Sequence, residues 1–280
     1  ATGATGNVVL GNYIGTNATG NGDINGTSQV NAASGVVIRN GASNNRIGTN
    51  ADGSNDSAER NIISGNNWYG VEMIGNGTSN NIVQGNYIGI DVTGQAVLGN
   101  SVGGVSFWNA ASNNWIGSGL TGAGNVISGN GTGVLIANGV TNNKVQGNII
   151  GLAADGATAL GNTGVGVYAY NGGSASLVTG NVIGTDADGS NDSGERNIIS
   201  ANFRGVAFEN AEVTGNFIAG NYIGTDSTGL LDRGNALDGV YILNGANINT
   251  IGGSSTTQRN IISGNNDDGI QIDGEASDGN

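Results

Sequence analysis

Hydrophobic residues in this chain recur in three short motifs that follow one another in a fixed order. The first is Asn-x-Ile, in which an Asn precedes a large aliphatic residue by two positions. The second begins with Gly, followed by Val or Ile and, two positions later, usually by another large apolar residue. The third is Asn followed two positions later by Ile or Val. Such alternation, broken by Gly and Asn, predicts strands of two to four residues separated by tight corners.

Each motif occurs eight times. The first motif begins at Asn12, Asn61, Asn86, Asn125, Asn148, Asn197, Asn221 and Asn260. The second begins at Gly35, Gly70, Gly104, Gly133, Gly166, Gly205, Gly239 and Gly269. The third begins at Asn45, Asn81, Asn114, Asn143, Asn181, Asn216 and Asn249, with Asn280 in the eighth place. Because the motifs interleave in strict order, the sequence predicts about eight turns of a three-sided coil with three short strands per turn.

The length of a turn alternates along the chain. Successive Asn residues of the first motif lie 49, 25, 39, 23, 49, 24 and 39 residues apart, which places longer loops on alternate turns. Period-2 counting points Ile14 and its equivalents inward, as it does the apolar pairs of the second motif. We therefore expect one all-β solenoid domain over residues 1–280. At about 4.8 Å per turn, it would be about 38 Å long.

The Asn residues of the first motif have a structural explanation. A side-chain amide is both donor and acceptor, so identical Asn residues stacked at strand spacing can bond to one another along the axis. Asn also tolerates the left-handed backbone that a sharp corner needs. We expect these eight residues to form a structural ladder rather than a binding site.

The pattern GNYIGTDSTG, GNALDGVYI, NTIGG and RNIISGNNDDGIQI resembles the repeats of right-handed parallel β-helix proteins of pectate-lyase-like architecture. Within that group it is similar to the Gly- and Asn-rich arrays of bacterial cell-surface proteins. The resemblance covers the whole chain and implies an extracellular or cell-surface location. It leaves function open, because this scaffold hosts polysaccharide lyases, epimerases, adhesins and passive stalks.

Composition restricts the chemistry. The 280 residues include 55 Gly, no Pro, no Cys and no His, and their formal net charge is −13. This charge and the scattered basic residues argue against nucleic acid as a partner, and the short apolar runs argue against membrane insertion. Without Cys, disulfides and thiol catalysis are excluded. Without His, the Tyr/His/Asp type of epimerase motif cannot be carried over to this chain.

The basic residues favour structural roles over substrate binding. Arg46 and Lys144 take the outward position of the third motif, but three turns separate them by about 14 Å, so we expect two solvated charges. Arg60, Arg196 and Arg259 each precede an Asn of the first motif on even turns. We expect these three to cap carbonyls of adjacent odd turns.

Two acidic loops are the best candidates for a ligand site. They read NADGSNDSAER at 50–60 and DADGSNDSGER at 186–196. Ca²⁺ prefers six to eight oxygen ligands, which short acidic Gly loops can supply. The EF-hand pattern is absent, and a solvated acidic turn is the alternative. Ca²⁺ is thus a candidate ligand, and no other cofactor is required. The candidate ligand residues are Asp52, Asp56, Asp186, Asp188 and Asp192.

Apolar and aromatic residues suggest two further surfaces. Trp68, Tyr69, Trp108 and Trp115 could stack on sugars, although they are spread over several turns. The residue after each Asn of the first motif points outward, and all eight are apolar or aromatic. If uncovered, they would form an interaction stripe; long loops could instead cover them, or both strand residues could face inward. The stripe consists of Tyr13, Ile62, Tyr87, Val126, Ile149, Ile198, Tyr222 and Ile261.

The leading hypothesis is a non-catalytic, extracellular structural or adhesive repeat segment, such as a stalk, spacer or filament subunit. Gly6-Asn7 and Gly279-Asn280 occupy the same phase of the repeat. This phase match predicts stacking end to end with another copy, or with further repeats of a longer chain. The alternatives are a polysaccharide lyase or epimerase, and a module that binds surface polysaccharide.

Overall fold

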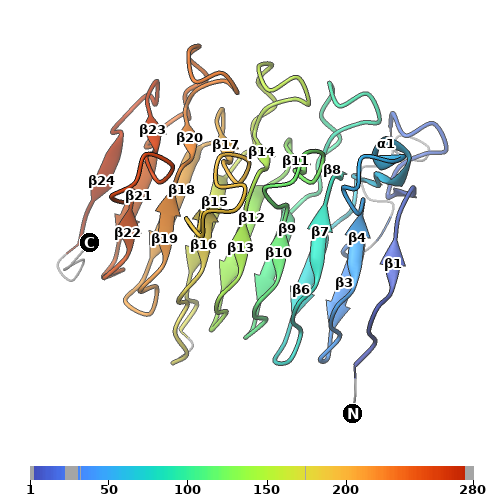
Figure 1. Ribbon diagram of the computed structural model, residues 1–280, viewed down its shortest axis with the longest axis horizontal. Helices are drawn as coiled ribbons and strands as arrows, with labels where there is room; N and C mark the ends of the chain where they lie inside the picture. Colours follow the sequence, from blue (N-terminus) through green and yellow to red (C-terminus); the bar gives the residue numbers. More distant parts are fainter. Residues whose placement is uncertain (1–2, 23–30, 32, 174, 275–280) are drawn as a thin grey trace.

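The structure is a computed structural model that describes residues 3–22, 31, 33–173 and 175–274. Its strands form three parallel sheets of eight strands each, and the chain passes once through every sheet per turn (Figure 1). The fold is a right-handed parallel β-helix of about eight turns, which confirms the three-sided coil predicted from the motifs and the fold class implied by the resemblance.

The three sheets correspond to the three motifs and are named after them. The first sheet contains β2 (Tyr13–Ile14), β5 (Ile62–Ile63), β8 (Tyr87–Ile88), β11 (Val126–Ile127), β14 (Ile149–Ile150), β17 (Ile198–Ile199), β20 (Tyr222–Ile223) and β23 (Ile261–Ile262). The second sheet contains β3 (Val36–Arg39), β6 (Tyr69–Ile74), β9 (Gly103–Trp108), β12 (Thr132–Ala137), β15 (Val165–Tyr170), β18 (Arg204–Glu209), β21 (Val240–Leu243) and β24 (Ile270–Ile272). The third sheet contains β1 (Val8–Val9), β4 (Arg46–Gly48), β7 (Ile82–Gln84), β10 (Trp115–Ile116), β13 (Lys144–Val145), β16 (Val182–Gly184), β19 (Phe217–Ala219) and β22 (Thr250–Ile251).

The third sheet takes its eighth strand from the N-terminal end. There Asn7 precedes β1, whose Val9 pairs with Ile47 of β4. The eighth place that the sequence gives to Asn280 lies outside the described residues. The short helix α1 (Asp56–Glu59) lies in the loop between β4 and β5.

The core consists of columns of similar side chains, because the register places equivalent residues of successive turns on top of one another. Val71 pairs with Val105, and Met73 pairs with Phe107. All four are completely buried. Burying an aliphatic or aromatic side chain contributes about 1.5–3 kcal/mol, so these columns supply much of the stability of the coil.

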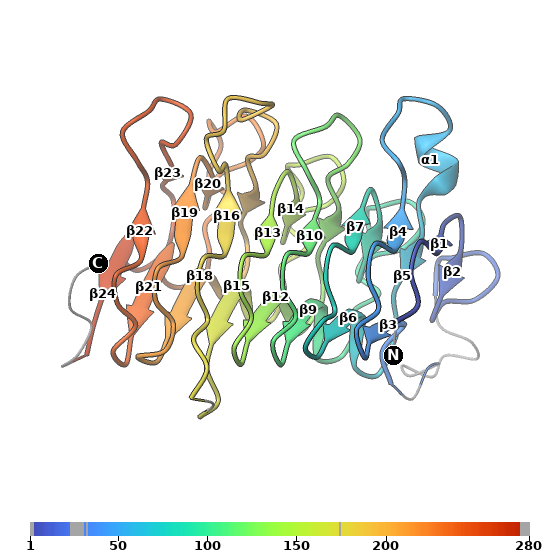
Figure 2. The ribbon, with the colours of Figure 1, turned by 60° about the horizontal axis from the view of Figure 1, so that its bottom comes forward.

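The longer loops of alternate turns lie at two corners. One set, at 49–60, 117–124, 185–196 and 252–259, connects the third sheet to the first and projects from the coil (Figure 2). The other set connects the first sheet to the second, and its loops bond to one another in a row. The N–H groups of Val92, Ala154 and Ser227 donate to the carbonyls of Gly20, Gly94 and Gly156 over 2.9–3.0 Å.

Gly and Ser alternate after Asn-x-Ile because they meet on neighbouring turns. On odd turns the Gly is left-handed, as in Gly151 with φ of 98°, where a Cβ would lie 1.9 Å from the carbonyl oxygen of Ser200. On even turns the Ser hydroxyl bonds to the next turn. Ser128 Oγ donates to the carbonyl of Leu152 over 2.7 Å and accepts from the N–H of Gly151 at 3.0 Å. Ser64, Ser128 and Ser200 each fix the left-handed corner of the following turn in this way.

Replacing Ser128 with Ala is expected to lower the free energy of unfolding by about 1–2 kcal/mol, because the buried carbonyl of Leu152 loses its donor. Urea unfolding followed by Trp fluorescence measures this loss. The control is Ser263→Ala, which changes the equivalent Ser in the exposed last described turn and should have little effect. Equal losses in the two variants would contradict the role given to the buried hydroxyl.

Candidate functional site

The Asn residues of the first motif form one hydrogen-bonded ladder. Each Nδ2 donates to the Oδ1 of the Asn on the next turn, over 2.8–3.2 Å along the seven steps. The same Oδ1 also accepts from the backbone N–H of the preceding Asn, as Asn125 does from Asn86 at 3.0 Å. Nδ2 uses its second hydrogen to donate to a backbone carbonyl. For Asn125 this is the carbonyl of Val83, at 2.9 Å. The buried amides are fully used within the coil.

Two further ladders occupy the other corners. The Asn residues of the third motif are linked in the same way from Asn7 to Asn249, with Nδ2 to Oδ1 distances of 2.8–3.1 Å. The last ladder lies between the first and second sheets, with distances of 2.7–3.2 Å, and the motif analysis missed it. Its members are Asn31, Asn66, Asn100, Asn130, Asn162, Asn202, Asn235 and Asn265.

The predicted outward stripe is not one continuous exposed surface. The even-turn residues Ile62, Val126 and Ile198 are only 3%, 5% and 6% exposed, whereas Tyr13 at one end is 46% exposed. Loops contact odd-turn residues of the stripe: a Cβ on Gly94 would lie 2.9 Å from the ring of Tyr87, and one on Gly229 would lie 2.9 Å from the ring of Tyr222. Loop contact, one of the two alternatives raised by the sequence, is therefore seen at Tyr87 and Tyr222.

Arg60 and Arg196 lie over this same face in equivalent ways. Arg60 Nε donates to the carbonyl of Gly85 over 3.2 Å, and Arg196 Nε to that of Gly220 over 3.1 Å. Their guanidinium groups stack at 4.1 Å on the rings of Tyr87 and Tyr222. Both cap a carbonyl of the following odd turn, as the sequence predicts. Arg259 is instead exposed.

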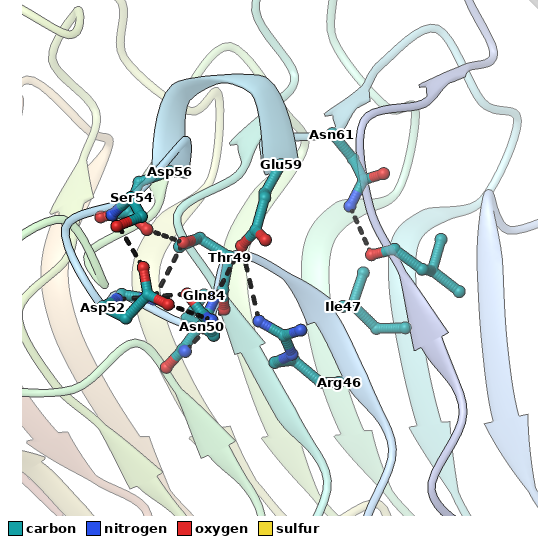
Figure 3. Close-up of polar contacts among 12 residues, drawn as sticks. Arg46, Ile47, Thr49, Asn50, Asp52, Ser54, Asp56, Glu59, Asn61 and Gln84 are labelled. Atoms are coloured by element: carbon teal, nitrogen blue, oxygen red, sulfur yellow. Dashed lines mark hydrogen bonds and ion pairs between the residues drawn. The ribbon is translucent and has the colours of Figure 1, made fainter.

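The acidic loop at 50–60 is closed by its own hydrogen bonds (Figure 3). The Thr49 hydroxyl donates to Asp56 over 2.6 Å, and the N–H of Ser54 donates to Asp52 over 2.7 Å. The N–H of Asn50 donates to Glu59 at 2.9 Å, and the same carboxylate pairs with Arg46 at 3.6 Å. Arg46 is thus an ion-pair partner of the loop and not a freely solvated charge.

The acidic loop at 186–196 gathers three carboxylates. Asp186, Asp192 and Glu195 each have a carboxylate oxygen within 4.8 Å of the others. The sequence pointed to Asp186 and Asp192 but missed Glu195, whereas Asp188 accepts from Ser190 N–H at 2.7 Å and stays outside the group. Lys144 Nζ contacts Asp186 directly. Because Lys144 already supplies a positive charge and loop amides supply donors, this geometry does not require a metal.

Burial raises the pKa of Glu195 above its usual range. The Thr185 hydroxyl acts in the opposite direction, and the Asp186 carboxylate raises the pKa further. A carboxyl group with a raised folded-state pKa stabilises the fold in its protonated form. That contribution is full below the unfolded pKa, about 4.3, and is lost as the pH rises through the folded value.

Replacing Glu195 with Gln is therefore expected to raise the melting temperature at neutral pH, with the difference from the unmodified chain disappearing below about pH 4. Thermal unfolding across this pH range measures the effect. Glu59→Gln, at the equivalent position of the other acidic loop, is the matched control. A melting temperature that is unchanged or lower at neutral pH would contradict the expectation.

The outer face of the second sheet carries a second apolar cluster. Tyr69, Leu135 and Ala137 are buried there, although they lie outside the coil, and Trp108 packs against them. Burial raises the pKa of Tyr69 to about 12, and the Glu72 carboxylate acts in the same direction. The structure thus brings Tyr69 and Trp108 of the predicted sugar-stacking set together, whereas Trp115 lies on the third sheet.

Two more Tyr residues complete this aromatic face. The rings of Tyr168 and Tyr170 stack at 5.4 Å with an interplanar angle of 18°, and the Tyr168 hydroxyl bonds Glu209. The sequence analysis did not identify these Tyr residues. Their two-residue spacing on a strand of the second motif was the available signal, because alternate residues of a strand share a face. The aromatic face is defined here as Tyr69, Trp108, Leu135, Tyr168 and Tyr170.

No helix in the described part of the chain is both long and apolar enough to cross a membrane. Comparison of the chain with models of protein families, with curated proteins and with solved structures found no match.

Proposed function

We propose that this chain is a non-catalytic structural or adhesive segment of an extracellular or cell-surface protein, acting as a stalk, spacer or filament subunit. The single observation that carries the proposal is the set of three Asn ladders, each of which runs through eight turns. Fully satisfied buried networks rigidify the elements that they join. Ladders at all three corners hold each turn against its neighbours, which suits a protein that must keep a fixed distance and direction.

The proposed partners are further turns stacked on the coil, supplied by a longer chain or by a second copy. Support comes from the register, which repeats from turn to turn, so that one more turn would extend all three sheets. Unpaired strand edges favour such pairing.

Electron microscopy of negatively stained protein at rising concentration, with and without Ca²⁺, tests this stacking. We expect rods that lengthen in steps of about 38 Å. Uniform short particles under every condition would exclude stacking of separate copies, leaving only further repeats of a longer chain.

The catalytic alternative is tested directly. The protein is incubated with uronate polysaccharides, and the ultraviolet absorbance of an unsaturated product is followed. We expect no increase over the buffer, with and without Ca²⁺. Turnover that saturates with substrate would overturn the non-catalytic proposal.

The aromatic face favours carbohydrate as the partner of an adhesive segment. Its stacked Tyr rings offer flat apolar surfaces, and Glu72 and Glu209 supply hydrogen-bond acceptors beside them. Ser106 faces outward between Glu72 and Leu135, and its buried hydroxyl has no hydrogen-bond partner. The rings of Trp108, Tyr168 and Tyr170 are half-buried, and apolar surface with polar neighbours is typical of interaction sites.

Replacing Tyr170 with Ala is expected to abolish most of the retention on glycan arrays that the unmodified chain shows, because one of the two stacked rings is lost. The control is Tyr13→Ala, which removes an exposed Tyr from the first sheet. Equal retention of the two variants would contradict a role of the aromatic face in binding.

A further inference from the structure

Three carboxylates meet where the chain enters β21 and β24, neighbouring strands near the C-terminal end of the coil (Figure 1). Asp238, Asp267 and Asp268 each have a carboxylate oxygen within 4.8 Å of the other two. Asp238 directly precedes Gly239, and Asp268 directly precedes Gly269. The N–H of Gly239 donates to the carbonyl of Asp268 at 2.9 Å. The two Asp residues therefore hold the same position on successive turns.

Stacking of equivalent residues, which creates the Asn ladders, here places one carboxylate beside another. Like charges directly opposite each other destabilise a sheet. The residues at this position on the earlier turns are Ser34, Tyr69, Gly103, Thr132, Val165 and Arg204. The carboxylates are thus confined to the last two described turns, where Asp267 adds a third.

Asp238 is repelled by the neighbouring carboxylates, and one of its own oxygens has no hydrogen-bond partner. The residue is completely buried; its Oδ2 accepts from Arg204 Nε at 2.8 Å, whereas its Oδ1 has no hydrogen-bond partner. The guanidinium of Arg204 lies 5.2 Å from the ring of Phe203 and 4.6 Å from that of Tyr241. Arg204 thus lies against both rings and bonds only one of the two carboxylate oxygens. A buried carboxylate normally has all its oxygens bonded, so the orphaned Oδ1 indicates a missing partner.

Charge counting gives the class of ligand. Three carboxylates against one guanidinium leave an excess of two negative charges. We propose that Asp238, Asp267 and Asp268 bind one divalent cation that prefers oxygen ligands. Ca²⁺ fits this donor set, because its flexible coordination accepts carboxylates from several segments and completes its shell with water. The site is separate from both acidic loops, and a cation there ties two successive turns together.

Calorimetric titration with CaCl₂ tests the site. The main variant is Asp267→Asn/Asp268→Asn, which removes two exposed carboxylates and leaves the buried Asp238–Arg204 pair in place. The matched control is Asp52→Asn/Asp188→Asn, which removes the same charge from the two acidic loops. We expect the unmodified chain and the control to bind one ion at this site and to gain melting temperature with Ca²⁺. We expect the main variant to lose both effects.

Three outcomes would overturn the proposal. The main variant could bind Ca²⁺ as the unmodified chain does. The control could lose binding while the main variant keeps it, which would place the ion in the acidic loops. Both variants could weaken equally, which would show a response to overall negative charge. Circular dichroism confirms that each variant is folded, and Asp267→Asn alone provides a milder second test of the same site.

Discussion

Replacing Gly151 with Ala should unfold this part of the coil or destabilise it by about 4 kcal/mol or more, which is the range of exceptional single substitutions. The added Cβ would lie 1.9 Å from the carbonyl oxygen of Ser200 and 2.6 Å from Oδ1 of Asn202. Both neighbours belong to the next turn and are held there, the first by the backbone and the second by an Asn ladder. Neither can withdraw without breaking the stack.

The matched control is Gly53→Ala in the acidic loop at 50–60. Gly53 is also left-handed, with φ of 84°, but no atom lies within 4 Å of its virtual Cβ. Only the backbone strain of about 1–2 kcal/mol remains. Hydrogen exchange across turns five and six, together with urea unfolding, measures the difference. Similar losses of unfolding free energy in the two variants would show that the close approach of the turns does not determine the effect of the added Cβ.

Replacing Asn125 with Ala should cost about 3–5 kcal/mol. Its side chain makes four hydrogen bonds: two from Nδ2, to Asn148 and Val83, and two accepted by Oδ1 from Asn86. All these partners lie in the buried interior, where water cannot replace the lost hydrogen bonds. Stability is lost mainly because buried polar groups of the neighbouring turns lose hydrogen bonds, and less because the Asn125 side chain itself is removed.

Asn12→Ala is the control for this prediction, because Asn12 is an exposed end member of the same ladder. Its side chain donates to Asn61 and Leu10, and water can replace it. We expect a loss of about 1 kcal/mol. Urea unfolding compares the two variants. Equal losses of unfolding free energy in Asn125→Ala and Asn12→Ala would contradict the role given to burial.

The architecture was predictable from sequence because the same short patterns determine both register and core. In Asn-x-Ile, the Asn defines the corner and the Ile defines the inward face, so matching motifs also aligned the strands. The ladder containing Asn66 and Asn100 escaped this reasoning. Asn66 lies five residues after the Asn that begins its turn, whereas Asn100 lies 14 residues after its own. Because loops of different length precede them, the two Asn residues do not align in the sequence, although they occupy equivalent positions in the structure.

The candidate sites were less predictable, because they depend on the paths of loops and on contacts between turns. Strand alternation correctly points Ile62 away from the core, but it cannot show which group lies over that side chain. In the same way, spacing within the loop at 186–196 suggested Asp188, whereas the folded loop brings Glu195 to Asp186 instead. The stacked carboxylates of Asp238 and Asp268 follow from matching their positions before Gly, an alignment visible in the sequence once the repeat is known.

The alternation of Gly and Ser has a consequence for how such a chain can change in length. A left-handed Gly on one turn requires a Ser on its neighbour, and the long loops recur with the same alternation. Duplicating or deleting a single turn would place two Ser corners, or two Gly corners, against each other. The smallest genetic module that can be copied without a mismatch is therefore a pair of turns. Natural or engineered variants should differ in length by whole pairs.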